Sequence, residues 1–516
     1  MANKDNQFQK LVSHCKEYGF IFQSSEVYDG LAAVYDYGPY GVELKNNIKD
    51  YWWKSMVQMH ENIVGIDAAI FMHPKVWKAS GHVDAFNDPM IDNKVSKKRY
   101  RADQLVEEYV ENKVLKKANK EIEKARKRFG DVFDEEQYKT TNPRVMGYLE
   151  KAQKILTRLN TSLTNEDLAD VKALIEELEI ACPESGSREW TDLRQFNLMF
   201  NTQLGTIAGE EGKLYLRPET AQGIFVNFLN VQKSTRQKIP FGIAQIGKAF
   251  RNEIVARQFI FRMREFEQME MQFFIRPGEQ KKWYAYWKEL RMKWHRALHP
   301  ENKLRYHDHE KLAHYADAAL DIEFEFPFGF RELEGIHSRT DFDLRNHQEL
   351  AGRKIQYFDP ELNESYIPYV LETSIGLDRM FLATMSHALQ EETVPDASGK
   401  DSTRTVLKLH PALAPVKCAV LPLVKNKVEL TAKAREIFDR LKFSFNCQYD
   451  EKDAIGRRYR RQDAIGTPFC VTIDFDSLED GKVTIRERDS LRQERIAIED
   501  IEKTVLQRVD FKNLLD

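Results

Sequence analysis

The feature that most constrains this chain is a long run of alternating side chains, RMREFEQMEMQFF, at residues 262–274. Successive side chains of a β-strand point to opposite faces, so this run predicts a long strand with one apolar and one polar face. Such a strand belongs in an antiparallel sheet that has a core on one side. The polar face is either an ordinary solvated surface or a binding surface. It carries Arg262, Arg264, Phe266, Gln268, Glu270 and Gln272.

Further strands and helices are predicted around this strand. Alternation predicts strands at LYLR, FGIAQIGKAF, DIEFEF and YIPYVLE, and a helix opening at Pro218 between the first two. Pro39 suits the first position of an amphipathic helix, and Leu377 begins another helix with an apolar stripe. We therefore expect an α+β catalytic domain whose antiparallel sheet is flanked by helices.

Two other regions differ in pattern from this domain. Residues 103–185 are charged, poor in aromatic residues and helical in pattern, and after Pro415 strands and helices alternate as in a small α/β module. The breaker-rich stretch EETVPDASGKDS separates that module from the sheet domain. The expected boundaries are 1–102, 103–185 (a helical insertion), 186–410 and 411–516 (a C-terminal α/β domain).

Composition excludes several classes of protein. With 42% hydrophobic and 31% charged residues, the 516-residue chain is typical of globular proteins and long enough for about three domains. The net charge of −3 leaves contact with a polyanion to local basic patches. Five scattered cysteines argue against a disulfide framework, and a polar N-terminus without a long apolar segment argues against secretion or membrane insertion. We expect a cytoplasmic protein.

Arginines flank the long strand. Arg251 ends the preceding strand, so a hairpin brings it close to Arg262. Guanidinium groups stay charged and bind phosphate oxygens in a bidentate manner, which suits a triphosphate. Arg379 lies in the first turn of the helix that begins at Leu377, where a cation is unfavourable, and this position favours recruitment of an anion. The alternative is a surface arginine that reaches into solvent.

These residues resemble a known family. FRNE (250–253) with RMREF is similar to motif 2, and GLDR (376–379) to motif 3, of class II aminoacyl-tRNA synthetases. Together with VYDYGPYGVELKNNI, LYLRPETAQGIF, FRELEGIHSRTDFDL and VLETSIGLDR, they closely resemble the homodimeric glycyl-tRNA synthetase family. The resemblance runs from about residue 8 to the end and weakens in the insertion.

The resemblance implies roles in ATP binding. Arg251 would hold the α-phosphate, and Arg262 and Arg379 the γ-phosphate; these three are the expected catalytic residues. Glu253 would accept a hydrogen bond from the adenine amino group, and Phe266 would stack on the ring. The other ATP positions that the motifs imply are Asn252, Phe261, Glu332, Leu333 and Gly376, with Glu332 also at the magnesium position.

The resemblance also implies a glycine site. Glu219, Glu270 and Glu372 match the family's carboxylates around the ammonium group, and Ser374 and Arg101 match further substrate contacts. Phe266 and Gly376 border the same site. Acids that fill the space of a side chain would exclude alanine by collision.

Two departures from the family stand out. The family often holds zinc with cysteine pairs in the insertion, but here Asn93, Ser96 and Ser185 stand at cysteine positions and Cys182 alone remains. One thiolate does not make a tetrahedral zinc site, so we expect no structural zinc here. Arg331 replaces a glycine that usually precedes the Glu332 position.

The basic run of Arg457, Arg458, Arg460 and Arg461, with Tyr459 between them, falls in the family's anticodon-binding domain. Such interleaving is typical of single-stranded RNA readers, and the alternative is a solvated charged loop. The Pro39 helix resembles motif 1, which predicts a symmetric homodimer; its alternative is a plain core helix.

The resulting hypothesis is a glycine–tRNA ligase that uses ATP and Mg²⁺, acts on glycine and tRNA(Gly), and does not bind membranes. One rival is a noncatalytic module like the accessory subunit of mitochondrial DNA polymerase, which should have lost some of Arg251, Glu253, Arg262 and Arg379. A second rival is an amino-acid adenylating enzyme that uses no tRNA, and the basic C-terminal domain argues against it.

Overall fold

The computed structural model describes residues 2–130, 133–205, 212–253, 258–309, 312, 316–395 and 401–515. The chain forms two compact units. One comprises Met1–Ser80, Phe200–Arg251 and Arg257–Asp516, and the other comprises Gly81–Met199 and Asn252–Ala256. Among the described residues, no helix combines the length and apolar character needed to cross a bilayer.

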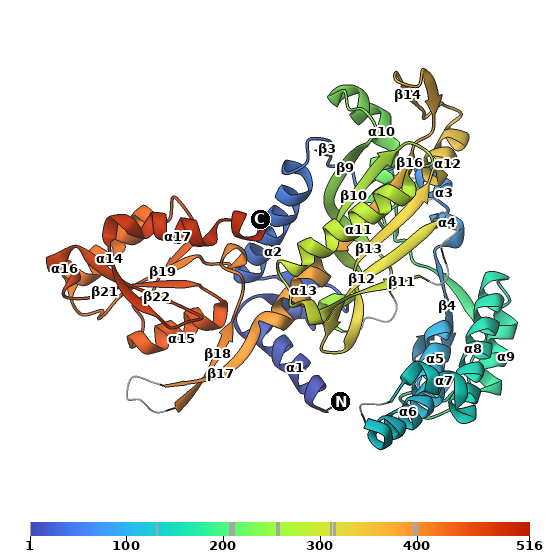
Figure 1. Ribbon diagram of the computed structural model, residues 1–516, viewed down its shortest axis with the longest axis horizontal. Helices are drawn as coiled ribbons and strands as arrows, with labels where there is room; N and C mark the ends of the chain where they lie inside the picture. The colour runs from blue at the N-terminus through green and yellow to red at the C-terminus, as the bar shows by residue number, and fades with distance from the viewer. Residues whose placement is uncertain are drawn as a thin grey trace. The chain divides into compact units, whose positions relative to one another are not determined.

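A seven-stranded sheet forms the centre of the first unit (Figure 1). All neighbouring strands are antiparallel except β3 and β9, which run parallel. The predicted antiparallel sheet is therefore confirmed. In spatial order its strands are β11 (Leu304–Asp308), β12 (Ala318–Phe326), β13 (Gly329–Thr340), β16 (Tyr369–Gly376), β10 (Glu265–Ile275), β9 (Phe241–Phe250) and β3 (Ile63–Gly65).

Strand β10 starts later than its sequence pattern predicts. Gln258 and Phe259 have positive φ angles of 68° and 57°, and the 3₁₀ turn η6 (Phe259–Phe261) follows them. Because Ile260 and Phe261 are buried in this turn, the extended chain begins only at Glu265. The prediction that Arg262 and Arg264 lie in the strand was therefore wrong, although Phe266 to Gln272 alternate as expected.

Helices cover both faces of the sheet. Met269, Met271 and Phe273 of β10 pack in one core with α2 (Pro39–Trp53), α11 (Gln280–Arg296) and α13 (Leu377–Ala388). On the opposite face, α10 (Ala221–Thr235) and α12 (Phe342–Ala351) cover Phe274 at the end of β10. Proline is the first residue of α2 as predicted, whereas α10 begins at Ala221 and not at Pro218.

Shorter elements complete this unit. The breaker-rich stretch that we expected to end the sheet domain is instead part of a two-stranded ribbon, and residues 396–400 within it lie outside the described residues. The other short elements are α1 (Ala2–Glu17), β1 (Ile21–Gln23), β2 (Tyr35–Tyr37), α3 (Pro74–Ala79), β7 (Asn201–Gln203), β8 (Lys213–Tyr215), β14 (Tyr357–Asp359), β15 (Glu364–Tyr366), β17 (Leu389–Pro395) and β18 (Asp401–Leu407).

The second unit joins a small sheet to a group of helices with their own apolar core, which includes Val106, Ile155 and Trp190. Its helical character agrees with the sequence pattern. Its elements are α4 (His82–Ala85), β4 (Asn87–Asp92), β5 (Arg99–Arg101), α5 (Ala102–Tyr109), the π-helical turn η3 (Val110–Leu115), α6 (Lys116–Phe129), α7 (Glu135–Thr141), α8 (Pro143–Thr164), α9 (Leu168–Glu177) and β6 (Arg194–Asn197).

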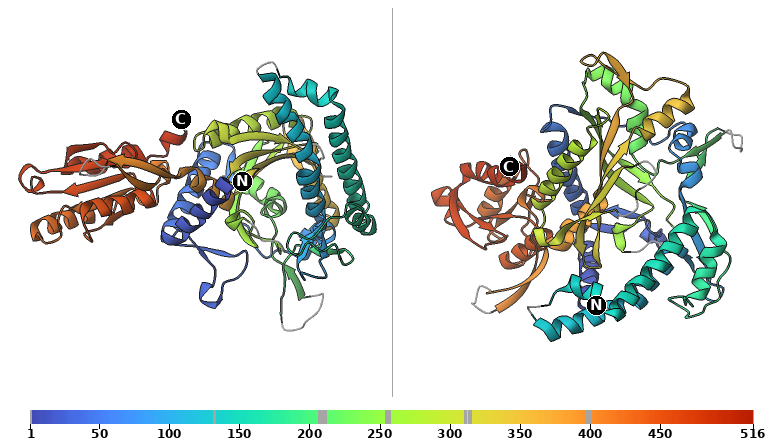
Figure 2. Two further views of the ribbon diagram at one scale, coloured as in Figure 1. Left: turned by 90° about the horizontal axis from the view of Figure 1, so that it is seen from below. Right: turned by 45° about the vertical axis from the view of Figure 1, so that its right-hand side comes forward.

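The C-terminal module is a five-stranded mixed sheet with helices on both faces, as the red and orange segments of Figure 2 show. This agrees with the predicted α/β module. Its strands are β19 (Cys418–Pro422), β20 (Cys447–Tyr449), β21 (Phe469–Ile473), β22 (Lys482–Glu487) and β23 (Gln493–Ala497), and its helices are α14 (Val428–Leu441), α15 (Ile455–Ile465), α16 (Ser477–Asp480), α17 (Ile501–Val509) and α18 (Lys512–Leu515).

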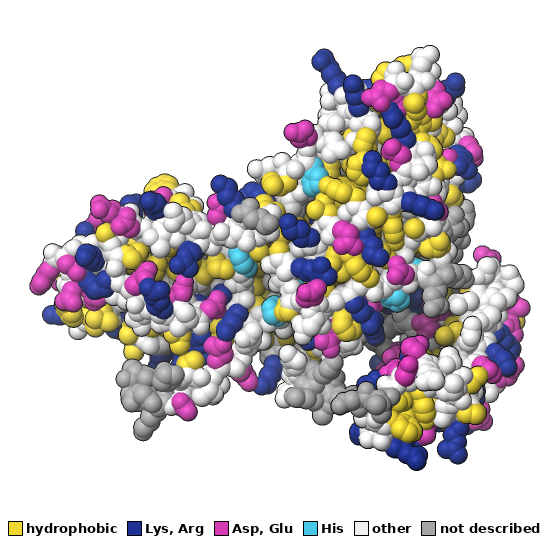
Figure 3. Space-filling model, in the orientation of Figure 1, with side chains coloured by type: hydrophobic (Ala, Val, Ile, Leu, Met, Phe, Trp, Pro, Cys, Tyr) yellow, Lys and Arg dark blue, Asp and Glu magenta, His cyan; other side chains and the backbone are white. Residues whose placement is uncertain are grey.

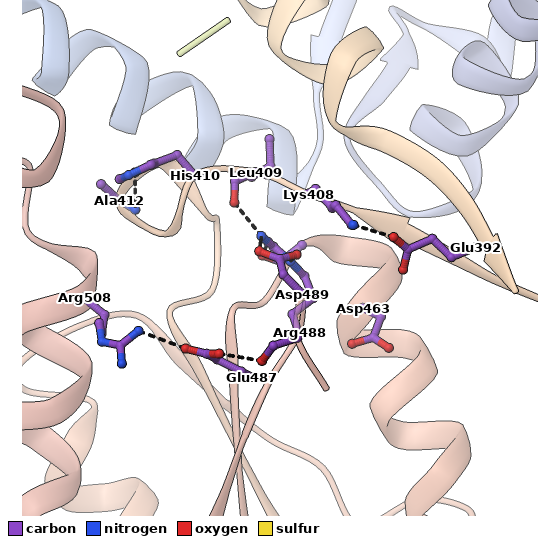
Figure 4. A network of polar contacts seen from close by, with 12 residues as sticks. Glu392, Lys408, Leu409, His410, Ala412, Asp463, Glu487, Arg488, Asp489 and Arg508 are labelled. Carbon is purple, nitrogen blue, oxygen red and sulfur yellow. Dashed lines mark hydrogen bonds and ion pairs between the residues drawn. The ribbon is translucent and has the colours of Figure 1, made fainter. Parts of the chain in front are cut away.

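Polar contacts fix the segment that leads into this module (Figure 4). Arg488 is buried and donates to the carbonyl of Leu409 at 2.7 Å, and Lys408 pairs with Glu392 of β17. The entry to the module is therefore tied both to its own sheet and to the β17–β18 ribbon.

On the face shown in Figure 3, basic and acidic side chains are intermixed over the described surface. This agrees with a chain of almost balanced charge. The five cysteines are buried and free.

Candidate active site

The strand register places the predicted glycine-binding acids side by side. Glu270 of β10 pairs with Ser374 of β16, and Gln272 pairs with Glu372 two residues further along. Residues two apart point to the same face, so all four side chains share the polar face of the sheet. The period-two pattern of the sequence therefore produces a cluster of acids on adjacent strands.

A shared hydrogen-bond donor, the side chain of Gln272, bridges two of these acids. Gln272 Nε2 donates to Glu270 Oε1 and to Glu372 Oε2, with a distance of 2.7 Å to each. Arg339 Nη1 donates to Glu372 Oε2 at 3.0 Å, and His337 Nδ1 lies 2.8 Å from Glu372 Oε1. Glu372 is thus held by three donors.

The pKa values of Glu270 and Glu372 are shifted in opposite directions. Burial, together with the charges of Glu372 and Glu219, raises the pKa of Glu270 well above its ordinary value. Burial acts in the same direction on Glu372, but Arg339 and His337 outweigh it and lower the pKa of Glu372 to about 2. Without a bound cation, the surroundings therefore favour the neutral form of Glu270 and the ionised form of Glu372.

Glu219 supplies the third acid from the turn before α10. Gln222, in the first turn of α10, donates to Glu219 Oε1 at 3.0 Å, and the Thr220 hydroxyl donates to Glu270 Oε2. The pKa of Arg339 is raised well above its ordinary value although burial lowers it, and Glu219 contributes to this increase. The structure therefore brings Glu219, Glu270 and Glu372 together.

The predicted phosphate-binding residues meet at β13 and α13. Arg379 Nη1 donates to Glu332 Oε2 at 2.8 Å, and its guanidinium lies 4.4 Å from the centre of the Phe261 ring. Arg379 lowers the pKa of Glu332, and Arg251 acts in the same direction, so Glu332 lies within the field of both arginines. The arginine in the first turn of α13 is thus paired with an acid and is not simply exposed to solvent.

Arg251 and Phe266 also lie close together. The Arg251 guanidinium is 5.2 Å from the centre of the Phe266 ring, and its Nε donates to the carbonyl of Pro218 at 3.1 Å. Arg262 is partly exposed and follows turn η6 directly. This places a cation and an aromatic face together at the start of β10.

Some predicted contacts are limited to backbone atoms. The side chains of Leu333 and Phe261 are buried in the apolar core, and the carbonyl of Phe261 accepts from Arg379 Nε at 3.3 Å. Any ligand contact of Leu333 in this conformation is therefore through its main chain. Gly376 is the residue that directly precedes α13, and Gln268 Nε2 donates to Ser374 Oγ at 3.2 Å.

Arg331, the departure from the family pattern, is an exposed residue of β13 that pairs with Phe324. The register of β12 shifts next to this pair, between Ile322 and Glu323. The arginine is accommodated within the strand.

Three predicted site residues belong to the second compact unit. Arg101 pairs with Asp103 at 2.6 Å and with Asp88 at 3.1 Å. Glu253 contributes to the raised pKa of Arg101, and the backbone N–H of Asn252 donates to the carbonyl of Leu198 at 2.7 Å. Residues 254–257 of the loop that follows lie outside the described residues.

A buried ionic network lies beneath the site. Lys45 of α2 pairs with Glu267 of β10 at 2.8 Å and with Asp378 of α13 at 3.2 Å. The backbone N–H of Glu267 donates to Asp378 Oδ2 at 2.8 Å, and the Tyr37 hydroxyl donates to Oδ1. This network joins the motif 2 strand to the helix that carries Arg379.

The four positions at which the family has cysteines do come together in the second unit. Ser96 Oγ lies 3.4 Å from Cys182 Sγ, and Ser185 Oγ donates to Asn93 Oδ1 at 3.1 Å. Burial raises the pKa of Cys182, but hydrogen bonds from Ser185, Ser96 and Tyr100 reverse this and lower it to about 6. Side chains that hydrogen-bond to one another occupy these positions, and the expected absence of a structural zinc ion here stays a prediction.

The predicted tRNA-binding run forms helix α15 and not a loop. Arg458 is 1% exposed and donates to the carbonyls of Pro422, Asp450 and Leu423, so its predicted contact with tRNA was wrong: the guanidinium is already occupied inside the module. Arg457 is exposed, Arg460 donates to Ser402, and Arg461 pairs with Asp450 and Asp453.

Sequence reasoning placed Gln272 on the polar face without giving it a role, and it missed the other residues that build the acid cluster, namely Thr220, Gln222, His337, Arg339 and Asp343. Arg339 donates to both oxygens of Asp343 as well as to Glu372. The signal was present, because Gly335, His337 and Arg339 alternate along β13 in the same way as the polar residues of β10.

Three family models match the chain. The tRNA synthetase class II core domain (G, H, P, S and T) matches residues 205–388, the glycyl-tRNA synthetase insertion domain 1 matches residues 88–198, and the anticodon binding domain matches residues 417–508.

Full-length relatives agree with these matches. The chain is similar to a glycine–tRNA ligase of Chlorobaculum tepidum, with 53% identity over 489 residues that cover 94% of this chain and 97% of the relative. It is 48% identical to a glycine–tRNA ligase of Staphylococcus haemolyticus over 509 residues, which cover 98% and 99% of the two chains. It is also 49% identical to a glycine–tRNA ligase of Staphylococcus aureus (strain Newman) over 504 residues, which cover 97% and 98%.

Proposed function

The chain belongs to the glycine–tRNA ligase family of class II synthetases, and we propose that it joins glycine to the 3′ end of tRNA(Gly) in two steps. The glycine carboxylate attacks the α-phosphate of ATP, which forms glycyl adenylate and releases pyrophosphate. The terminal ribose hydroxyl of the tRNA then attacks the adenylate carbonyl carbon and releases AMP. The observation that carries this proposal is the cluster of Glu219, Glu270 and Glu372, together with the pairing of Arg379 with Glu332 in the field of Arg251.

Glycine recognition follows from the charges of the acid cluster. Glu219, Glu270 and Glu372 cannot all ionise next to one another without a cation, as the raised pKa of Glu270 indicates. An ammonium group relieves this repulsion and accepts no hydrogen bonds, so it suits carboxylates as partners. The carboxyl groups also occupy the space that a larger amino-acid side chain would need, which favours glycine.

ATP is held, in this proposal, by the residues that match motifs 2 and 3. Arg251 faces the α-phosphate, where negative charge grows during the attack, and Arg262 and Arg379 face the γ-phosphate. Phe266 stacks on adenine, and Asn252, Glu253, Phe261, Leu333 and Gly376 border the nucleotide. The role of the protein is mainly to position the substrates and to stabilise charge.

Magnesium is the proposed ion of the ATP phosphates, and Glu332 is the residue that would hold it. The side chain of Glu332 is 48% exposed and offers carboxylate oxygens, which are the ligands that Mg²⁺ prefers. When bound, the ion reduces the negative charge on the phosphate oxygens. Arg379, already next to Glu332, orients that carboxylate.

Further parts of the chain have proposed roles. Ser374 and Arg101 complete the glycine contacts, and residues 103–185 and 411–516 act as the insertion and the anticodon-binding domain, with the catalytic domain at 1–102 and 186–410. Arg457, Arg460 and Arg461 approach tRNA from α15. We also propose a cytoplasmic homodimer in which α2, the motif 1 helix, lies at the interface.

Pyrophosphate exchange with each of the twenty amino acids tests the proposal. We expect exchange only with glycine, and a loss of about 10²- to 10³-fold in the Arg251→Ala variant because one phosphate contact is removed. Arg345→Ala, which removes an exposed arginine from α12, is the matched control and should exchange like the wild type. Exchange that does not depend on glycine would contradict glycine as the substrate. Full exchange in Arg251→Ala would contradict the proposed phosphate-binding role of Arg251.

A further inference from the structure

Three potential metal ligands lie on one face of the sheet, on neighbouring strands β12 and β13 and directly after the end of β11. His337 pairs with Ala319, whose carbonyl accepts from the backbone N–H of His309, and Asp321 lies two residues beyond Ala319. This register brings His309, Asp321 and His337 to the same face. Each offers a ligand atom, and these atoms lie within 4.8 Å of one another.

The contact between two of these side chains already has nearly the spacing of metal ligands. His309 Nε2 lies 2.9 Å from Asp321 Oδ2. Two ligand atoms on a tetrahedral zinc ion, each about 2.0 to 2.1 Å from the metal, are about 3.3 Å apart. A small rearrangement of the side chains therefore suffices to place an ion between them.

The third side chain, His337, is oriented by an acid behind it. Its Nδ1 lies 2.8 Å from Glu372 Oε1, so Nε2 is the nitrogen that is left for a metal. Histidines that bind metals usually donate their other ring N–H to a carboxylate or carbonyl, which fixes the tautomer and the ring plane. Glu372 provides this support.

The strand also leaves room for the His337 ring. Gly335 precedes it by two residues on the same face, and a Cβ atom at this position would lie 2.8 Å from His337 Cε1. Real Cβ atoms do not approach a ring carbon so closely, so any other residue would displace the imidazole. The absence of a side chain at Gly335 is what permits this ring position.

We propose that His309, Asp321 and His337 bind one divalent transition metal ion such as Zn²⁺. Two imidazole nitrogens and one carboxylate oxygen favour Zn²⁺ or Co²⁺ over Mg²⁺, which prefers oxygen ligands. Three protein ligands leave a fourth position for water or a substrate group, the arrangement typical of non-structural zinc sites. Glu332, the proposed magnesium residue, also lies near Asp321, so the surroundings are favourable for a cation.

Titration of the full-length, metal-free protein with Co²⁺ tests the site. We expect one Co²⁺ ion per chain with the visible absorption bands of a tetrahedral ion, displaced by Zn²⁺ but not by excess Mg²⁺. His309→Ala and Asp321→Asn should each weaken binding by at least about tenfold. His307→Ala is the matched control: His307 lies on β11 two residues before His309 and contacts Glu323, so its removal should leave the titration unchanged.

A fourth variant tests the glycine argument. Gly335→Ala should weaken Co²⁺ binding because the added methyl group displaces the His337 ring. Wild-type protein that binds no Co²⁺, equal binding by wild type and His309→Ala, or an equal loss in His307→Ala would each overturn the site. The titration contains no ATP, glycine or tRNA, so failure of the proposed ligase activity would not change its outcome. Circular dichroism shows whether a variant has folded, and if one has not, the remaining variants decide.

Discussion

Glu270 of β10 and Glu372 of β16 share one hydrogen-bond donor, the Nε2 of Gln272, which lies 2.7 Å from a carboxylate oxygen of each. The shared amide brings two buried acids so close together that their charges interact. Arg339 and His337 keep Glu372 ionised, and Glu270 retains its proton instead. In the free enzyme Glu270 therefore favours its neutral form, and a bound ammonium group would favour its ionised form.

The Glu270→Gln variant should be more stable than the wild type at alkaline pH. Because the pKa of Glu270 is raised in the folded state, the folded protein holds a proton that the unfolded chain loses above its ordinary pKa of about 4.3. Stability of the wild type therefore falls as pH rises from this value. Urea unfolding at pH 6 and pH 8.5 should show the variant gaining about 1 kcal/mol or more over the wild type at the higher pH. A pH-independent difference would contradict the raised pKa.

The KM for glycine should fall as pH rises through the raised pKa of Glu270. Ionisation of this residue adds the negative charge that attracts the ammonium group of glycine. Steady-state pyrophosphate exchange over pH 6 to 9 measures this dependence, with the KM for ATP as the internal control. In Glu270→Gln the dependence should vanish together with most of the exchange. A KM for glycine that rises with pH would argue against the assignment.

Replacing Arg339 with methionine should cost about 3 to 5 kcal/mol of stability. The guanidinium is buried and binds both Glu372 and Asp343, and its removal leaves Asp343 without this cation and Glu372 with only His337 as a basic partner. Arg345→Met is the control, since its pair with Asp341 is at the surface and contributes at most about 1 kcal/mol. Chemical denaturation gives the free energy of unfolding of both variants. Equal losses would mean that burial of Arg339 does not increase its contribution to stability.

Arg379→Ala should raise the KM for ATP at least about tenfold while stability changes little, because the side chain is partly exposed and its acid partner Glu332 can be solvated. Arg379→Lys should recover only part of the loss, since an ammonium group cannot bind phosphate in a bidentate manner. Exchange kinetics at varied ATP give the KM. Full recovery by lysine would show that a single positive charge is sufficient.

Arg457→Ala and Arg458→Ala should have different effects. Arg458 is buried and satisfies three carbonyl groups, so its loss should destabilise the C-terminal module by more than about 2 kcal/mol. Arg457 is exposed, and its loss should weaken tRNA binding without affecting stability. Thermal denaturation and a tRNA filter-binding assay separate the two effects. If Arg458→Ala were as stable as the wild type but bound tRNA poorly, the assignment of a structural role to Arg458 would be wrong.

Much of the fold could be predicted from local patterns. The alternation of Phe266 to Phe273 predicted β10, and Pro39 and the stripe after Leu377 predicted α2 and α13. These patterns succeed because one face of each element must be apolar to pack on a core, whatever its partner is. The predicted start of β10 was wrong because Gln258 and Phe259 have positive φ angles, which neither residue type indicates.

The candidate site was likewise predictable only in part. Motif resemblance named Arg251, Glu270, Glu372 and Arg379, and the structure brings Glu270 to Glu372 and both arginines to Glu332. The role of Arg458 could not be read from its neighbours, because successive side chains of a helix point about 100° apart, so one arginine of a run can be buried while the others are not. Burial of Arg458 depends on the carbonyls of Pro422 and Leu423, which are more than thirty residues away in the chain.

The order of residue types along this chain determined which strands and helices form and which side chains share a face, because those properties depend on neighbours a few positions apart. Only the tertiary structure decided which strands lie next to each other and in what register. That register makes Gln272 the common donor to Glu270 and Glu372 and places His309 and Asp321 beside His337. Hydrogen bonding between separate strands, whether consecutive like β12 and β13 or distant like β10 and β16, sets such contacts, and the pattern within one strand does not encode them.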